Sequence, residues 1–191
     1  MKKSNLYCLA FAITALYGCQ QPSSVKTETA AQAADFKPVA GVQDIMAYEV
    51  DPAADALWGS VSVVIDKRGI TENQPTTDKQ WDELRGRALI LIEAANLLSI
   101  DGRPVARKGF QKLDDEGTPG NYSAAQAQQA IEANRPVFNS FAKGLGLVGE
   151  QMLKAIDAKN SRDLMDAGGA LDEACEACHL KFWYPGDHAR R

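Results

Sequence analysis

The chain has 191 residues and a formal net charge of −4, and 45% of its residues are hydrophobic. It is long enough for one domain with a proper core. Its acidic balance excludes a protein that binds nucleic acid through a basic surface.

Residues 1–18 have the order of an export signal. Lys2 and Lys3 precede an apolar stretch from Leu6 to Tyr17, which ends at Gly18-Cys19 and is too short for a transmembrane helix. The junction resembles a bacterial lipobox, although Tyr17 stands where a small residue is usual. We therefore expect cleavage before Cys19 and acylation of Cys19, and an ordinary signal cut elsewhere is the alternative.

Residues 19–40 predict a flexible tether, because Gln20 to Val39 contains almost no large apolar residue. Removal of residues 1–18 takes away two lysines and no acid, which changes the net charge from −4 to −6. A partner steered by charge should then present a basic face. Gln20 after Cys19 is not an Asp retention signal, so we expect an anchor in the outer membrane, facing the periplasm.

Residues 41–186 predict one helical domain, followed by a tail at 187–191. Apolar residues recur at three- and four-residue steps from Val42 to Ile65, which indicates a first helix. Pro52 should kink that helix or start a new one with Asp51 as its cap. Segment 66–76 contains glycine, asparagine and proline, and it predicts a loop.

Two further helices are expected upstream of residue 160. Thr77 should cap the second, whose apolar stripe comprises Trp81, Leu84, Ala88, Leu91, Ile92, Ala95 and Leu98. Residues 101–122 form a long connection of the kind that is often functional. Ser123 should begin the third helix, which runs to about Ala158 with a bend at Pro136. Its glycines, Gly144, Gly146 and Gly149, either admit a close neighbour or merely loosen the helix.

The fourth helix should begin at Ser161 and end at Pro185-Gly186. Its inner side carries Leu164, Leu171, Cys175, Cys178 and Phe182. Four long helices and no credible strand predict an all-α fold, an antiparallel four-helix bundle with its ligand site between facing helices.

The sequence Cys175-Glu176-Ala177-Cys178-His179 has the C-x-x-C-H spacing of a covalent c-type haem site. On a helix, Cys175 and Cys178 share a face, so both thiols can reach the two vinyl groups of one porphyrin edge. His179 can then bind the iron as the proximal ligand. We expect one haem c per chain, attached covalently.

Two other interpretations of this motif are weaker. A redox pair of the thioredoxin kind belongs to a βαβ setting, which the sequence does not predict. A zinc site made of Cys175, Cys178, His179 and His188 requires the tail to fold back, and adjacent ligands fit a tetrahedron poorly. With Cys8 lost in the signal and Cys19 acylated, no cysteine remains for a disulfide.

The chain from about 41 to 184 resembles the cytochrome c prime family, helical-bundle monohaem proteins with C-x-x-C-H near the end of the fourth helix. The likeness is specific at the motif and at Phe182 three residues after it. It implies a distal residue on the first helix, where Met46 corresponds best. The family commonly has Arg after the aromatic residue, but this chain has Trp183, so Lys181 or Arg85 are candidates for propionate contacts.

The resemblance implies two functions that depend on Met46. Relatives with Met at this position ligate the iron and carry electrons, whereas members with Leu or Phe leave it five-coordinate and bind gases such as NO or CO. If Met46 does not ligate the iron, it is a residue that fills the core, as we expect of Met152 and Met165. We expect an electron carrier rather than an enzyme, because the two histidines leave no distal acid-base group. The sequence identifies no redox partner and allows a homodimer.

Overall fold

The computed structural model describes residues 37–186, which lie in a compact unit that spans Phe36–Arg191. The predicted signal at 1–18, the tether up to residue 36 and the tail at 187–191 lie outside the described residues. The same holds for Cys8, Cys19 and His188. Within residues 37–186, no helix is long and apolar enough to cross a membrane.

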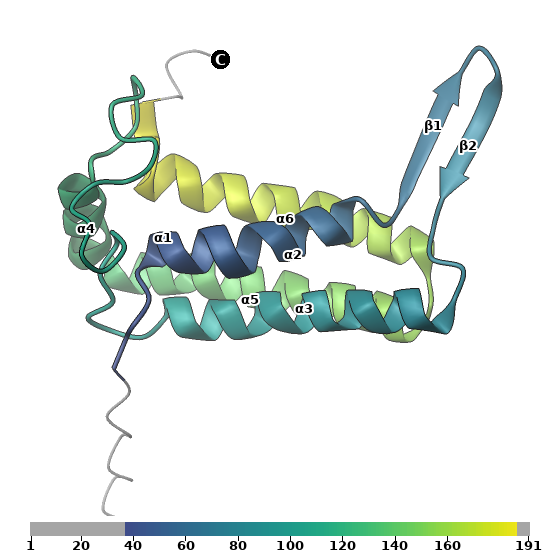
Figure 1. Cartoon of the computed structure of the whole chain (residues 1–191), viewed down its shortest axis with the longest axis horizontal. Helices are drawn as coiled ribbons and strands as arrows, with labels where there is room; N and C mark the ends of the chain where they lie inside the picture. Colours follow the sequence, from purple (N-terminus) through teal and green to yellow (C-terminus); the bar gives the residue numbers. More distant parts are fainter. Residues whose placement is uncertain (1–36, 187–191) are drawn as a thin grey trace, which may run out of the picture. The chain divides into compact units, whose positions relative to one another are not determined.

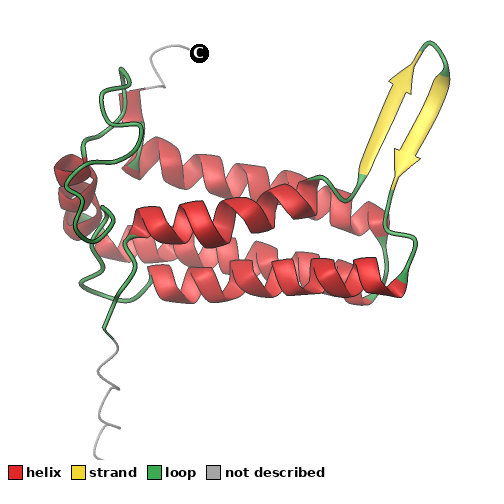
Figure 2. Cartoon of the chain, in the orientation of Figure 1, coloured by secondary structure: helices red, strands yellow, loops and turns green. Residues whose placement is uncertain are grey.

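The described chain is mostly helical and carries one two-stranded sheet (Figures 1 and 2). Four helical rods lie side by side, and each runs opposite to the one before it (Figure 1). The rods are α1 (Val42–Ile45), η1 (Met46–Val50) and α2 (Asp51–Trp58) as one unit, then α3 (Asp78–Leu98), α5 (Arg135–Asp157) and α6 (Ser161–Phe182). Short helix α4 (Ala124–Ala133) lies at one end of the rods.

The sheet corrects the expectation of an all-α fold. Strands β1 (Ser62–Asp66) and β2 (Gly69–Asn73) pair as an antiparallel hairpin, where the sequence predicted the end of the first helix and a loop. Gly59 and Ser60 end the helix, and the β-branched residues Val63, Val64 and Ile65 then favour a strand over further helix. Gly69 has a φ of +126°, which glycine adopts at little cost, and it closes the turn.

The first rod changes its winding immediately before Pro52. Residues Met46–Val50 form a π-helical turn, in which the Asp51 N–H donates to the Met46 carbonyl five residues back. Pro52 has no N–H, so an ordinary α-helical ladder would be interrupted here, and the wider turn accommodates its ring. The chain continues into α2 with helical dihedral angles at Asp51 and no side-chain cap, so Pro52 neither breaks the rod nor starts a separately capped helix.

The remaining helix boundaries agree with the sequence in part. Thr77 and Ser123 cap α3 and α4, since each hydroxyl accepts from an N–H three residues on. The predicted third helix is two helices, α4 and α5, because the chain leaves helical geometry at Asn134 between them. The cap of α6 is Asn160 rather than Ser161; the Asn160 amide oxygen accepts two N–H groups, while the Ser161 hydroxyl donates to Gln74.

The core lies between the rods, and α3 and α5 approach most closely at two glycines. A Cβ at Gly149 would lie 2.8 Å from Ile92 Cγ1, and one at Gly146 would lie 3.3 Å from the Ala95 Cβ. Gly146 and Gly149 therefore admit α3, which is the first of the two alternatives left open by the sequence, whereas Gly144 faces open space. Met152 is fully buried in this core as predicted, but Met165 lies at the surface and is not core filler.

Candidate functional site

The Cys-x-x-Cys-His motif lies within the last turns of α6, and its two cysteine side chains face the core. Cys175 and Cys178 pack against the hydrophobic core, and both are partly buried. His179 follows on the same helical surface and is partly buried as well. The helix continues to Phe182, whose buried ring fixes the end of α6. The motif is therefore held on a rigid element, as the spacing predicted.

An apolar cavity lies next to the motif, between η1, α5 and α6. It has a volume of about 30 Å³ and is partly open to solvent. Its lining comprises Met46 and Val50 of η1, Leu98 of α3, Phe138, Phe141, Ala142 and Leu145 of α5, and Ala174, Cys175, Cys178 and His179 of α6. All four predicted site residues of the domain line this one cavity, although Met46 is far from the other three in sequence.

Helix α5 supplies an apolar wall that the sequence analysis missed. The rings of Phe138 and Phe141 meet the ring of Phe182 edge-on, with centroid distances of 5.4 Å and 6.1 Å. Edge-to-face contacts of this kind stabilise a packed wall and fix its orientation. The signal was present in the sequence, because residues 138, 141, 142 and 145 recur at three- and four-residue steps and so share a helix face.

Burial keeps the two thiols protonated. It raises the pKa of Cys175 to about 11 and that of Cys178 to about 12, and the neighbouring carboxylate of Asp51 adds to the shift at Cys175. Burial also lowers the pKa of His179, although Asp51 and Glu176 oppose the shift. The imidazole is therefore neutral at pH 7, which is the form that binds a metal.

The loop between α3 and α4 contacts both of the helical segments that carry Met46 and His179. At its start, the Val42 and Gln43 N–H groups donate to Pro104 and Val105, at 2.8 Å and 3.0 Å. The loop also contributes an ion pair to α1, in which Arg107 Nε lies 2.8 Å from Asp44 Oδ1.

The end of the loop binds the end of α6. Trp183 Nε1 donates to Asp115 at 2.7 Å, and the Tyr122 N–H donates to the Trp183 carbonyl at 2.8 Å. Trp183, which stands where the resembled family commonly has Arg, therefore binds the loop. Residues 99–123, here called the bridging loop, thus hold the start of the first rod against the end of the last.

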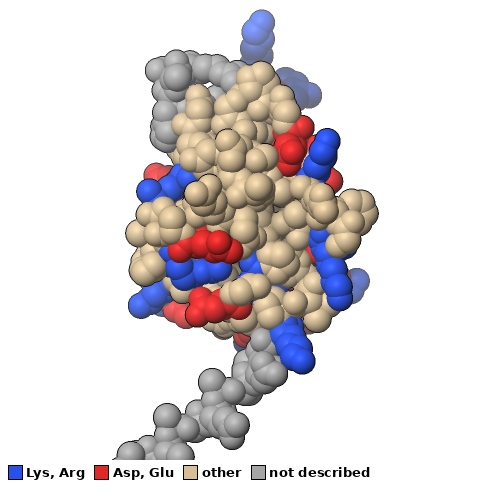
Figure 3. All heavy atoms as spheres, turned by 90° about the vertical axis from the view of Figure 1, so that its left-hand side faces the viewer, with Lys and Arg blue, Asp and Glu red and all other residues tan. Residues whose placement is uncertain are grey.

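The surface at this end of the molecule is mostly uncharged. Figure 3 looks onto it and shows basic and acidic side chains scattered around a broad uncharged area. His179 lies beside Trp183 and Tyr184, with ring centroids 6.4 Å and 5.7 Å away. Of the two propionate candidates, Lys181 lies on α6 near this end, but Arg85 pairs with Asp157 at 3.1 Å near the other ends of α3 and α5. Arg85 is therefore not a contact of the site.

The donor set fits a haem better than a metal ion bound by side chains alone. Among residues 37–186, no three His, Cys, Asp or Glu side chains are grouped so that they could hold a metal ion, and the zinc alternative needs His188, which lies outside this range. Haem iron takes four nitrogens from the porphyrin and requires only axial ligands from the chain. An imidazole and a thioether from different rods, with two thiols beside them in an apolar cavity, meet that requirement.

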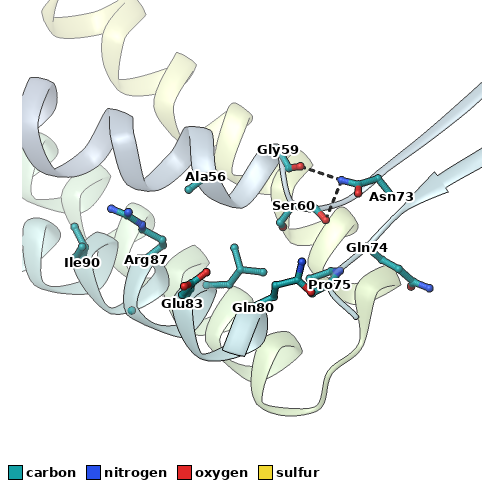
Figure 4. A pocket seen from close by; sticks show the side chains of 12 residues that line it. Ala56, Gly59, Ser60, Asn73, Gln74, Pro75, Gln80, Glu83, Arg87 and Ile90 are labelled. Carbon is teal, nitrogen blue, oxygen red and sulfur yellow. Dashed lines mark hydrogen bonds between the residues drawn. The ribbon is translucent and has the colours of Figure 1, made fainter. Parts of the chain in front are cut away.

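A larger depression lies at the far end of the rods and contains none of the predicted residues. It has a volume of about 640 Å³ and lies between the end of α2, the hairpin base and the start of α3 (Figure 4). Gln80, Glu83 and Arg87 of α3 point toward it, and Asn73 donates to the Gly59 and Ser60 carbonyls at its rim. It is open and polar, so it lacks the enclosed apolar surface of the cavity at the motif.

The chain matches no protein-family model, no curated protein and no solved structure. The function is therefore argued from the residues and the geometry of the site.

Proposed function

We propose that this chain is a monohaem c-type cytochrome that carries electrons, with His179 and Met46 as the axial ligands of the iron. The single observation that supports this most is the apolar cavity, whose lining includes Cys175, Cys178, His179 and Met46. Residues that are about 130 positions apart in sequence line this one cavity, and together they offer the thiols, the imidazole and the thioether that a c-type haem would need. The bound haem would supply one-electron chemistry between ferric and ferrous iron.

The chain's own residues would hold the cofactor and control its surroundings. Cys175 and Cys178 would anchor it by thioether bonds, and the neutral imidazole of His179 would ligate it from the α6 side. The thioether of Met46 would ligate from the η1 side and favour the ferrous state, which raises the reduction potential. Phe138 and Phe141 would keep water from the ring, because they form the apolar wall of the cavity.

The alternation of rod directions supports the finer proposal of an antiparallel four-helix bundle of the cytochrome c prime type, with the hairpin as an addition. We also propose that the protein is exported, acylated at Cys19 and held at the periplasmic face of the outer membrane. Its role would be to exchange electrons with protein partners rather than to catalyse a reaction on a substrate.

A gas-binding protein with five-coordinate iron is the second candidate. The observation that favours it is the composition of the cavity wall opposite α6, which apart from Met46 consists of hydrocarbon side chains such as Val50 and Leu98. Such a wall suits a small neutral ligand such as NO or CO. The two candidates differ in whether Met46 occupies the sixth position.

Covalent attachment is the first test. The chain, produced in a host that attaches c-type haem, should exceed the polypeptide mass by one haem, and acid-acetone extraction should leave the colour in the protein. The double variant Cys175→Ala/Cys178→Ala should lose the added mass, whereas Cys19→Ser should keep it. A colourless wild-type product that contains zinc would refute the proposal.

A further inference from the structure

The hairpin exposes an aliphatic face at some distance from the candidate haem site. Residues that pair across an antiparallel ladder share a face, so Val63 and Glu72 lie on the same side as Ile65 and Ile70. The side chains there are open to solvent, with exposed fractions of 46% for Val63, 75% for Ile65 and 68% for Ile70. An isolated two-stranded sheet is marginally stable in water, and it gains stability when a further surface covers its apolar face.

The base of the same face borders a groove of about 350 Å³ against α6. Its apolar floor includes Val63 and the surface residue Met165, which is 37% exposed. The charged residues in its lining are Glu72, Asp166 and Arg162, so acidic groups outnumber basic ones. None of these three forms an ion pair with another described residue.

The tip of the hairpin has the opposite character. It carries Lys67 and Arg68 next to the two most exposed aliphatic residues of the hairpin, Ile65 and Ile70. Arg68 is bound by Asp66 at 2.7 Å, whereas Lys67 has no ion-pair partner among residues 37–186. The aliphatic face therefore has a basic group at the tip of the hairpin and a mainly acidic groove at its base.

We propose that two copies of this chain form a symmetric dimer in which each hairpin tip lies in the groove at the base of its partner's hairpin. A two-fold axis makes such a contact reciprocal, because the tip of each copy meets the base of the other. Ile65 and Ile70 of one copy cover Val63 and Met165 of the partner. Lys67 of one copy lies near the acidic Glu72 of the other.

The aliphatic part of the contact is small. It consists of Val63, Ile65 and Ile70 with Met165 beside them, so the interface belongs at the lower end of the size range for specific interfaces. The dimer should therefore be of micromolar rather than nanomolar affinity. A lipid surface is a poorer occupant, because the leading end of the hairpin carries Asp66 as well as the two cations.

Sedimentation equilibrium of the purified full chain, from micromolar to hundred-micromolar concentration, tests the dimer. Ile70→Thr removes aliphatic surface from the proposed contact but keeps a β-branched residue, and it should weaken dimerisation about 10-fold or more. Val64→Thr is the matched control, because Val64 is 52% exposed on the opposite face of the same hairpin. It should leave the dimer unchanged.

A charge exchange tests the reciprocal contact. Lys67→Glu and Glu72→Lys should each weaken the dimer, and the double variant should restore it. The two residues are roughly 10 Å apart along one hairpin, so the rescue is not intramolecular. A wild-type chain that stays monomeric over the whole concentration range overturns the proposal, including the case in which that monomer binds anionic vesicles through Ile70. Equal weakening by Val64→Thr and Ile70→Thr, or failure of the rescue, also overturns it.

Discussion

Met46 begins the π-helical turn of the first rod, and Val50 ends it. A π-helical turn holds one residue more than an α-helical turn, so side chains after it are rotated relative to those before it. Val50, which ends the turn, lines the same cavity as Met46. Residues four apart also share a face of an ordinary α-helix, so the cavity side of the first rod follows its apolar periodicity.

Replacement of Met46 tests its role as sixth ligand. In the haem-loaded protein, Met46→Ala should convert a low-spin absorption spectrum to a high-spin one, lower the reduction potential and admit carbon monoxide rapidly, because the thioether no longer occupies the iron. Met152→Ala is the control. It should leave the spectrum unchanged and lower the free energy of unfolding by about 2–5 kcal/mol, since Met152 is fully buried away from the cavity. A wild-type protein that is already high-spin would favour the gas-binding candidate.

The raised thiol pKa values predict an alkaline dependence of the chain without haem. Cys175 and Cys178 should react slowly with iodoacetamide at pH 9, where free cysteine is largely ionised, and reach full reactivity only near pH 11 to 12. Because the folded pKa lies above the unfolded one, this burial contributes stability below about pH 9 that is lost as the pH rises toward 11 and 12. The same chain in urea is the control, and a midpoint near pH 9 in the folded chain would contradict burial of the thiols.

At this scale the sequence predicted four of the residues that line the cavity and missed its α5 wall. The fixed spacing of Cys175, Cys178 and His179 identified three members without any knowledge of the fold. Met46 required the resemblance, because one methionine on an apolar helix face is indistinguishable from core filler by pattern alone. Met165 illustrates this limit. It was predicted to be core filler, but it lies at the surface in the groove between the hairpin and α6. This place could not be predicted, because the hairpin itself was not.

The bridging loop contacts both ends of the chain segment that carries the candidate site residues. Its contacts with α1 and with the end of α6 join the two segments that carry the proposed axial ligands. The sequence did not predict these contacts, because the loop has no periodic pattern and only its length was informative. They are set by tertiary packing, which periodicity does not report.

Loss of the Asp115 carboxylate should loosen the bridging loop. Asp115→Ala removes the acceptor of the Trp183 and Asn121 side chains, and it should lower the free energy of unfolding by about 1–3 kcal/mol. In the haem-loaded protein it should also increase the rate at which carbon monoxide replaces Met46, because α1 is then held less firmly against α6.

The neighbouring residue gives a matched control for this effect. Asp114 is largely exposed and lies 3.5 Å from Arg107, so Asp114→Ala should change the free energy of unfolding by less than about 0.5 kcal/mol. Equal effects of the two variants would show that the loop has a general rather than a specific role in the site.

The helices were predictable where local chemistry decides them and not where two propensities compete. Thr77 and Ser123 are caps because their hydroxyls satisfy a free N–H, which the sequence alone reveals. The hairpin was missed because Val61 and Val64 also fit a helical spacing continued from α2. The sequence predicted one helix with a bend at Pro136, whereas the structure has a break at Asn134 and Pro136 lies in the first turn of α5. A proline fits both arrangements, so it did not distinguish them.

On the scale of the whole molecule, the predicted lipid would determine where electrons can be delivered. Cys19 lies 18 residues before the first described residue, so the proposed anchor and the described domain are that far apart in the sequence. With the signal removed, the chain carries a net charge of −6, which favours partners with a basic face.

Fractionation of cells tests the anchor. The wild-type protein should be found with the outer membrane, and Cys19→Ser should be released into the soluble periplasmic fraction, because the acylated residue is lost. The released variant should keep its covalent haem and its spectrum, which shows that only the anchor has changed. If Cys19→Ser remains with the membrane to the same extent, the ordinary signal peptide is the better interpretation.

The bridging loop also has a consequence for local fluctuations. Backbone hydrogen bonds within residues 107–121 are short turns, such as Phe110 to Arg107 and Thr118 to Asp115, whereas the helices on either side are held by long ladders. Segments of this kind open at a lower free energy than the rest of a domain. Amide hydrogens of the loop should therefore exchange with solvent earlier than those of α3 or α5. Such transient opening would release both neighbouring rods at once, so the loop sets how often solvent reaches the cavity.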